Sequence, residues 1–146
     1  MSRLALPVAA LALPVAALAL AALPALTGCS DPVDRQAAER AVQQFHRQLD
    51  AGQYDAIYTA AAPDLRNGVT RAQFVALASA VHARMGATQS SKEQHWRRKV
   101  GPTDSADLAQ QYLTRYAAGE VHESFTWRMK GDEARLVEYK ADLPPL

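Results

Sequence analysis

Residues 108–142 read LAQQYLTRYAAGEVHESFTWRMKGDEARLVEYKAD, and this stretch decides the fold. Apolar and polar residues alternate along much of it, which is the period of a half-buried β-strand. Two pairs of turn residues, Ala118-Gly119 and Gly131-Asp132, divide it into three segments. The sequence therefore predicts three consecutive antiparallel strands joined by short hairpins. Their expected bounds are about 108–117, 120–130 and 133–142.

A further strand is expected before these three, ending at Gly101-Pro102. Successive side chains of a strand alternate between its faces. One face is therefore expected to hold Gln94, Trp96, Arg98 and Val100, and the other His95, Arg97 and Lys99. The stretch 87–91 before it is predicted to be a polar link.

Three helices are expected ahead of the sheet, over about 32–50, 53–61 and 71–85. In the first, apolar residues recur at helical spacing and form one stripe: Ala38, Val42, Phe45 and Leu49. The third begins with a capping box, Thr70 followed by Gln73. Residues 64–68 are predicted to be a loop. Helices followed by an antiparallel sheet indicate an α+β fold, with three N-terminal helices packed on a curved sheet of about four strands.

The beginning of the chain has the features of an export signal. Arg3 precedes an apolar run over 4–26, and the run ends in Leu26-Thr27-Gly28-Cys29. This ending resembles the lipobox of bacterial lipoprotein signal peptides. The resemblance implies cleavage between Gly28 and Cys29, and lipid attachment to Cys29. The alternative is a transmembrane helix, for which the run is long enough, but three prolines interrupt it.

The lipoprotein hypothesis divides the chain into four parts. These are a signal peptide over 1–28, a lipidated tether over 29–31, one domain over 32–142 and a tail over 143–146. Ser30 follows the cysteine directly, and resemblance to enteric lipoprotein sorting implies the outer membrane, facing the periplasm. The partner expected from this segment is the membrane, through the N-terminal lipid.

The charge balance limits the classes of partner. Arg3 is the only charged residue before Cys29, so the part after it carries 15 basic and 15 acidic residues. Nucleic-acid binding needs a strong excess of cations, so no nucleic-acid partner is expected. Cys29 is the only cysteine, which excludes an internal disulfide.

The mature part resembles the nuclear-transport-factor-two-like superfamily, also called cystatin-like or SnoaL-like. The phrases that support the resemblance are LDAGQYD at 49–55, YAAGEVHESF at 116–125 and LVEY at 136–139, within three helices followed by consecutive strands. Among its members, the chain is most similar to small exported bacterial domains of unknown function, of the type numbered 4019. The resemblance covers about 33–142 and implies a cone, in which a bent sheet wraps a long helix and often encloses a cavity. The chain departs from the pattern in its first strand, which is strongly basic.

No catalytic, metal or cofactor site is predicted. The polar candidates on strands are His95, Tyr112, His122 and Glu123, and the preferred interpretation is surface side chains of a half-exposed sheet. His122 and Glu123 are adjacent, so they face opposite ways and cannot form a dyad. The four histidines lack zinc-ligand spacing and are expected at the surface or at an edge.

Arg97, Arg98 and Lys99 lie in the densest group of charges and are the candidates for contact with an anion. The simpler interpretation is an edge strand whose charges prevent aggregation. The leading hypothesis for function is a non-enzymatic, lipid-anchored periplasmic domain that binds an envelope protein or a small ligand. The alternatives are an enzyme or apolar-ligand carrier that uses the cone cavity, and a structural accessory of an envelope complex.

Overall fold

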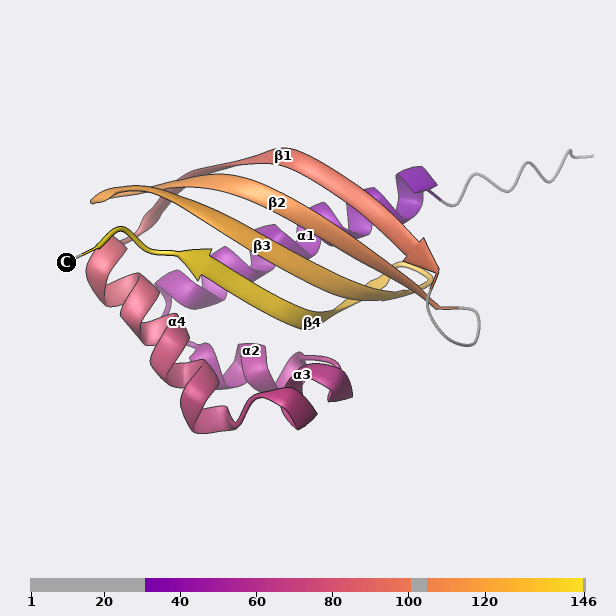
Figure 1. Ribbon diagram of the computed structural model, residues 1–146, viewed down its shortest axis with the longest axis horizontal. Coiled ribbons are helices and arrows are strands. Elements are labelled where there is room, and N and C mark those ends of the chain that lie inside the picture. Colours follow the sequence, from indigo (N-terminus) through magenta and orange to yellow (C-terminus); the bar gives the residue numbers. More distant parts are fainter. Residues whose placement is uncertain (1–30, 101–104, 146) are drawn as a thin grey trace, which may run out of the picture.

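The computed structural model describes residues 31–100 and 105–145 of the chain. It has the expected α+β architecture, in which helices cover one face of a four-stranded antiparallel sheet (Figure 1). The helices are α1 (Asp31–Asp50), α2 (Tyr54–Ala60), α3 (Pro63–Gly68) and α4 (Arg71–Met85), and the strands are β1 (Thr88–Val100), β2 (Ala106–Tyr116), β3 (Gly119–Lys130) and β4 (Glu133–Asp142).

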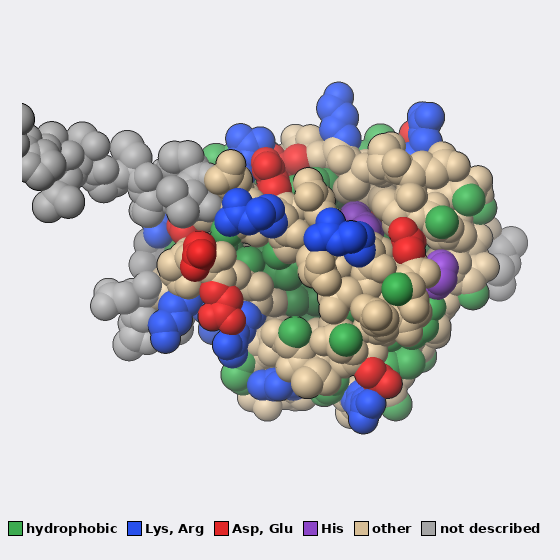
Figure 2. All heavy atoms as spheres, turned by 180° about the vertical axis from the view of Figure 1, so that it is seen from behind, with side chains coloured by type: hydrophobic (Ala, Val, Ile, Leu, Met, Phe, Trp, Pro, Cys, Tyr) green, Lys and Arg blue, Asp and Glu red, His purple; other side chains and the backbone are tan. Residues whose placement is uncertain are grey.

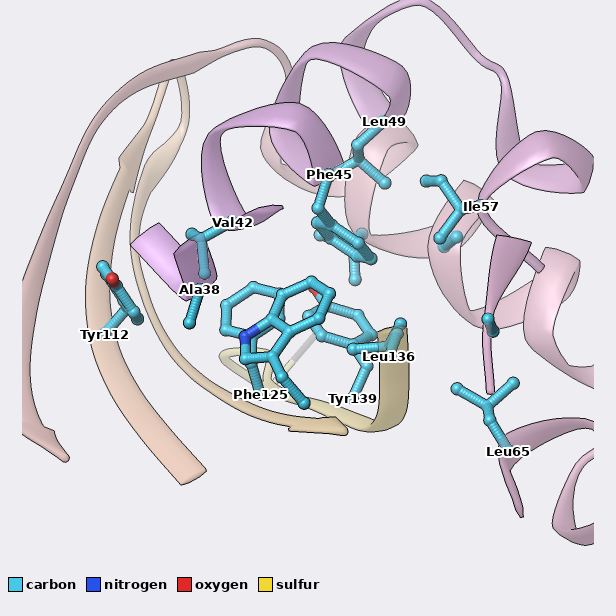
Figure 3. Packing of buried hydrophobic residues seen from close by; sticks show 14 of the residues in the cluster. Ala38, Val42, Phe45, Leu49, Ile57, Leu65, Tyr112, Phe125, Leu136 and Tyr139 are labelled. Carbon is cyan, nitrogen blue, oxygen red and sulfur yellow. The ribbon is translucent and has the colours of Figure 1, made fainter. Parts of the chain in front are cut away.

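The core lies between α1 and the sheet. The predicted stripe of α1 is confirmed, since all four of its residues are at most 2% exposed. Phe45 packs its ring against Phe125 at 5.1 Å and against Tyr139 at 4.5 Å between ring centroids. Figure 3 shows these rings meeting beneath α1, so side chains fill the interior of the cone. Aromatic rings remove large apolar areas from water and dominate the stability of such a core.

The sheet has the strand order β1-β2-β3-β4, so β1 and β4 are its edges. Buried residues alternate with more exposed ones along β2 and β3. Val121, Phe125, Trp127 and Met129 share the buried face, as predicted. A bulge near Gln94 shifts the register of β1, so that Glu93 and Trp96, rather than Gln94, face the helices.

The predicted ends of α1 and α4 are confirmed. Gly52 follows α1 with φ +69°, a left-handed conformation that favours glycine. The capping box of α4 is complete: Thr70 Oγ1 accepts from Gln73 N, and Thr70 N donates to the Gln73 side chain. Gly86 ends α4 with φ +75°.

Two local predictions are wrong. Residues 64–68 form α3 rather than a loop, because Pro63 begins a short helix and Leu65 buries its side chain. The expected polar link 87–91 is mostly strand, since β1 begins at Thr88 and pairs with the end of β2. Both segments are ordered by contacts with distant residues, which the local pattern does not contain.

The predicted lipid site and its flanks, Gly28, Cys29 and Ser30, lie outside the residues that the structure describes. Within the part it describes, none of the helices has the length and apolar character needed to cross a bilayer.

Candidate functional site

Glu123 has a deeply buried carboxylate, because the residue is only 1% exposed, against 8% for Asp34. His46 Nε2 lies 2.8 Å from Glu123 Oε2. Tyr116 and Tyr139 donate their hydroxyl protons to Glu123 Oε1, at 2.8 and 2.6 Å. The hydroxyl of Thr114 also hydrogen-bonds this carboxylate. We call Glu123 and these four partners the Glu123 cluster.

Hydrogen bonds keep Glu123 ionised inside the core. Burial raises the pKa of a carboxyl group, because a low dielectric disfavours the charged form. Hydrogen bonds and the electrostatic effect of His46 outweigh burial here, so the pKa of Glu123 lies below its ordinary value. An ionised carboxylate can only accept hydrogen bonds, so His46 Nε2 donates its proton to Glu123.

The two tyrosines remain protonated for a complementary reason. Burial, followed by the proximity of the Glu123 charge, raises the pKa of Tyr116 and of Tyr139 well above the ordinary value. Both phenols are therefore fixed as donors. A saturated acceptor surrounded by fixed donors has no free position for a reacting molecule.

The cluster joins four elements of the fold. His46 comes from α1, Tyr116 from β2, Glu123 from β3 and Tyr139 from β4. Glu123 occupies an inward position of β3, where the neighbouring inward residues are apolar. Its geometry therefore fits a polar connection that fixes α1 on the sheet.

A second polar group lies near the beginning of α1. Glu93 of β1 accepts from Arg35 of α1 and from Gln110 of β2, both at 2.6 Å. Gln110 also donates to the hydroxyl of Tyr112 at 3.3 Å. Burial, with the negative charge of Glu93 as the next cause, raises the pKa of Tyr112. This group connects the inward face of β1 to α1.

A hollow of about 190 Å³ lies between α1, α2 and the β3–β4 hairpin. Eight of its ten lining residues are apolar, and Phe45 and Trp127 have the largest side chains among them. The two polar ones are Gln44 and Gln48 on α1. Figure 2 shows hydrophobic side chains in its floor, near the centre of that face. We call it the α1–α2 hollow.

A larger groove, of about 580 Å³, lies between β4 and the helices α3 and α4. Phe74, Leu77 and Tyr139 line it, together with Val69, which is 38% exposed. Neither this β4 groove nor the α1–α2 hollow is lined by Glu123 or by His46. Tyr139 thus borders the β4 groove, while Glu123 and His46 are separated from both spaces by packed side chains.

Comparison with known proteins gives a family. Residues 41–139 match the family model DUF4019, described as a protein of unknown function. The chain belongs to the DUF4019 family. The match extends from α1 to β4 and includes His46, Glu123 and Tyr139. No curated protein matches the chain.

The predicted anionic contact of this DUF4019 domain lies on the edge strand β1. Arg97 and Lys99 are exposed. Arg98 is engaged, because its Nε donates to Asp34 Oδ2 on α1 at 3.2 Å. Arg98 thus differs from Arg97 and Lys99, because its charge is paired with that of Asp34. Contact with an anion stays a prediction.

The expected surface role of the polar strand residues is partly wrong. His95 and His122 are exposed as expected, and His122 and Glu123 lie on opposite faces. Glu123 and Tyr112, however, are buried. Each faces the helices and has hydrogen-bond partners that offset the loss of water.

His46 is the functional candidate that sequence reasoning missed. It is 5% exposed, whereas the histidines were expected at the surface. The signal was present, because His46 follows Phe45 directly and lies four residues after Val42. This spacing places it at the margin of the buried stripe of α1. Among the residues with described positions, no group of three or more metal-ligating side chains comes together.

Proposed function

We propose that this DUF4019 protein is a lipid-anchored protein of the bacterial envelope, and that its domain binds a small apolar ligand in the α1–α2 hollow without catalysing a reaction. Cys29 would carry the lipid that anchors the protein in the outer membrane. The domain would then face the periplasm. Binding would use shape and apolar contact rather than charge.

The α1–α2 hollow carries the binding part of the proposal. Apolar pockets with a few polar groups are the usual form of small-molecule sites. A cavity of about 150 Å³ lined by apolar side chains can hold a benzene-sized ring, and this hollow is comparable in volume. The amides of Gln44 and Gln48 supply donors and acceptors that would orient a ligand with one polar end.

The state of Glu123 supports a binding role over catalysis. A general base needs access to the proton it removes. Glu123 is saturated with donors and lines neither described space, and its pKa is lowered rather than tuned towards neutrality. An enzyme built on this cluster would have to open the core first.

Calorimetric titration of the purified chain with benzene and with toluene tests the binding site. Ala41 lines the α1–α2 hollow, so Ala41→Leu places a larger side chain there without breaking the helix. We expect binding to the natural chain and at least about a tenfold weaker affinity in Ala41→Leu, because the occupied volume is lost.

The matched control is Ala72→Leu. Ala72 is exposed on α4 and lines neither space. Equal affinity of the natural chain, Ala41→Leu and Ala72→Leu would show that benzene and toluene bind outside the hollow. This result would contradict the proposal. Mass spectrometry of the peptide that contains Cys29 tests the anchor separately, and an unmodified thiol would contradict it.

A second candidate is binding of an envelope protein at the β4 groove, including a structural accessory role. The apolar lining of the groove favours it, because Phe74, Leu77 and the exposed Val69 lie together beside an open sheet edge. Val69→Asp would then abolish co-purification with a partner while leaving benzene binding unchanged.

A further inference from the structure

We propose that the end of the domain at which α1 begins rests on anionic lipid headgroups, and that Arg97 and Lys99 of β1 make this contact. The proposal rests on lipid attachment at Cys29, which is part of the proposed function. It adds an orientation of the domain on the bilayer and the class of lipid that stabilises it.

The covalent distance between Cys29 and the domain is short. Ser30 is the only residue between Cys29 and Asp31, where α1 begins. One residue spans at most about 3.6 Å, so the two steps reach about 7 Å. Acyl chains on Cys29 would hold its sulfur at the membrane surface. The beginning of α1 is then confined to the headgroup layer or its immediate border.

The last residues of β1 lie at this same end of the domain. Arg98 near the end of β1 binds Asp34 in the first turns of α1 at 3.2 Å. Arg35, the next residue of α1, binds Glu93 of β1 at 2.6 Å. Figure 1 shows the end of β1 beside the beginning of α1. Whatever holds α1 at a membrane therefore brings Arg97 and Lys99 there as well.

Three carboxylates with described side chains lie near this end of the domain, and all three are already engaged. Arg98 pairs with Asp34, and Arg35 pairs with Glu93. Asp107, which pairs with Lys99 across the β1–β2 register, forms its ion pair with Arg128 at 2.5 Å.

Arg97 and Lys99, by contrast, have no ion pair with any side chain in the described ranges. Both are exposed. Two uncompensated cations within a Debye length of the surface, about 8 Å at physiological salt, would attract anionic lipid.

An acidic peptide added to the open edge of β1 would use the same cations. The tether favours the lipid, because it keeps headgroups at a high effective concentration beside β1, whereas nothing holds a peptide there. Each cation near an anionic surface changes the ratio of docked to undocked domain about fivefold. Loss of both should therefore lower this ratio about 25-fold.

The test uses the mature lipidated chain with a fluorophore on Gln94→Cys. Gln94 is exposed on β1, and thioether formation would leave the new cysteine as the only thiol. The protein is placed in vesicles of phosphatidylcholine, or of phosphatidylcholine and phosphatidylglycerol in equal parts, each with a nitroxide on some headgroups. We expect stronger quenching in the anionic vesicles, and a return to the neutral level with Arg97→Gln/Lys99→Gln or with added salt.

The matched control is Arg40→Gln/Arg115→Gln, which removes the same charge from exposed positions on α1 and β2. It should leave the quenching unchanged. A fluorophore on Gln53→Cys, beyond the far end of α1 and about 30 Å from its beginning, should not be quenched in either vesicle.

Equal quenching of the Gln94→Cys label in both vesicles overturns the proposal. If mass spectrometry of the same sample then shows lipid on Cys29, the anchor survives and only the docking fails. A free thiol at Cys29 overturns both.

Discussion

Glu123 places a negative charge inside the core, and its neighbours determine whether the fold tolerates that charge. Removing a carboxylate from water costs several kcal/mol. Hydrogen bonds to a charged group each contribute about 1.5–3 kcal/mol, and four side chains supply them here. The cost and the gain are comparable, so loss of a single partner should be felt strongly.

Tyr139→Phe removes one of these donors and keeps the ring. We expect the free energy of unfolding to fall by about 1.5–3 kcal/mol, because Glu123 Oε1 loses its 2.6 Å hydrogen bond. Urea denaturation measures this change. Tyr58→Phe is the control, because its hydroxyl donates to the backbone oxygen of Val69 and Tyr58 is only half-buried. A larger loss in Tyr58→Phe would contradict the assignment.

Acid should weaken the fold through Glu123. Its pKa is lower in the folded chain than its ordinary value of 4.5, so its contribution to stability is complete above about pH 4.5 and is lost as the pH falls through the folded pKa. Glu123→Gln cannot titrate, so its free energy of unfolding should vary less with pH below pH 4.5. Urea denaturation across that range measures the slope.

Asp55→Asn is the matched control for this pH dependence. A hydrogen bond from Arg71 lowers the pKa of the Asp55 carboxyl too, but the group is fully exposed. Solvent screens such a pair, so its removal should change the slope little. A slope that responds to Asp55→Asn and not to Glu123→Gln would show that the buried cluster is not the acid-sensitive group.

At the scale of the elements, the glycines that follow α1 and α4 differ in how well they tolerate replacement by another residue. Gly52 has φ +69° and open space where a Cβ would lie. Gly86 combines φ +75° with ψ −159°, a region almost restricted to glycine, and a Cβ there would meet Ala117 Cβ at 3.0 Å. The link from α4 to β1 therefore requires glycine more strictly than the link from α1 to α2.

Gly86→Ala should lower the free energy of unfolding by about 2–3 kcal/mol, since strain and contact add. Gly52→Ala should cost about 1 kcal/mol, because only the left-handed conformation is unfavourable. Thermal denaturation of the two variants compares these effects. Equal losses of unfolding free energy in the two variants would contradict this, because they would mean that the chain near Ala117 shifts without cost to accommodate the new Cβ.

The elements that the sequence predicted correctly carry their signals locally. The capping box at Thr70 and the turn at Gly131-Asp132 are examples. α3 and the first residues of β1 do not, because Ala62 at the beginning of α3 donates to the backbone oxygen of Leu136, and Thr88 pairs with Tyr116. The Glu123 cluster shows the same limit, since no local pattern relates His46 to a glutamate 77 residues away.

At the scale of the whole molecule, the cone is filled and the spaces lie at its margins. Aromatic rings occupy the volume between α1 and the sheet (Figure 3). The α1–α2 hollow is a gap of about 190 Å³ that α1, α2 and the β3–β4 hairpin leave between them. Its lining residues are mostly alanines and aromatics, which form no sequence motif. The sequence therefore predicted a fold that often encloses a cavity, but not the position or lining of this hollow.

We propose that this domain acts by binding an apolar molecule in the α1–α2 hollow. Methyl-resolved NMR during a benzene titration tests it most directly, because Ile57 lines the hollow while Val69 and Leu77 line the β4 groove. We expect saturable shifts of the Ile57 methyl resonances, with those of Val69 and Leu77 unchanged. Shifts confined to Val69 and Leu77, or none at saturating benzene, would contradict it.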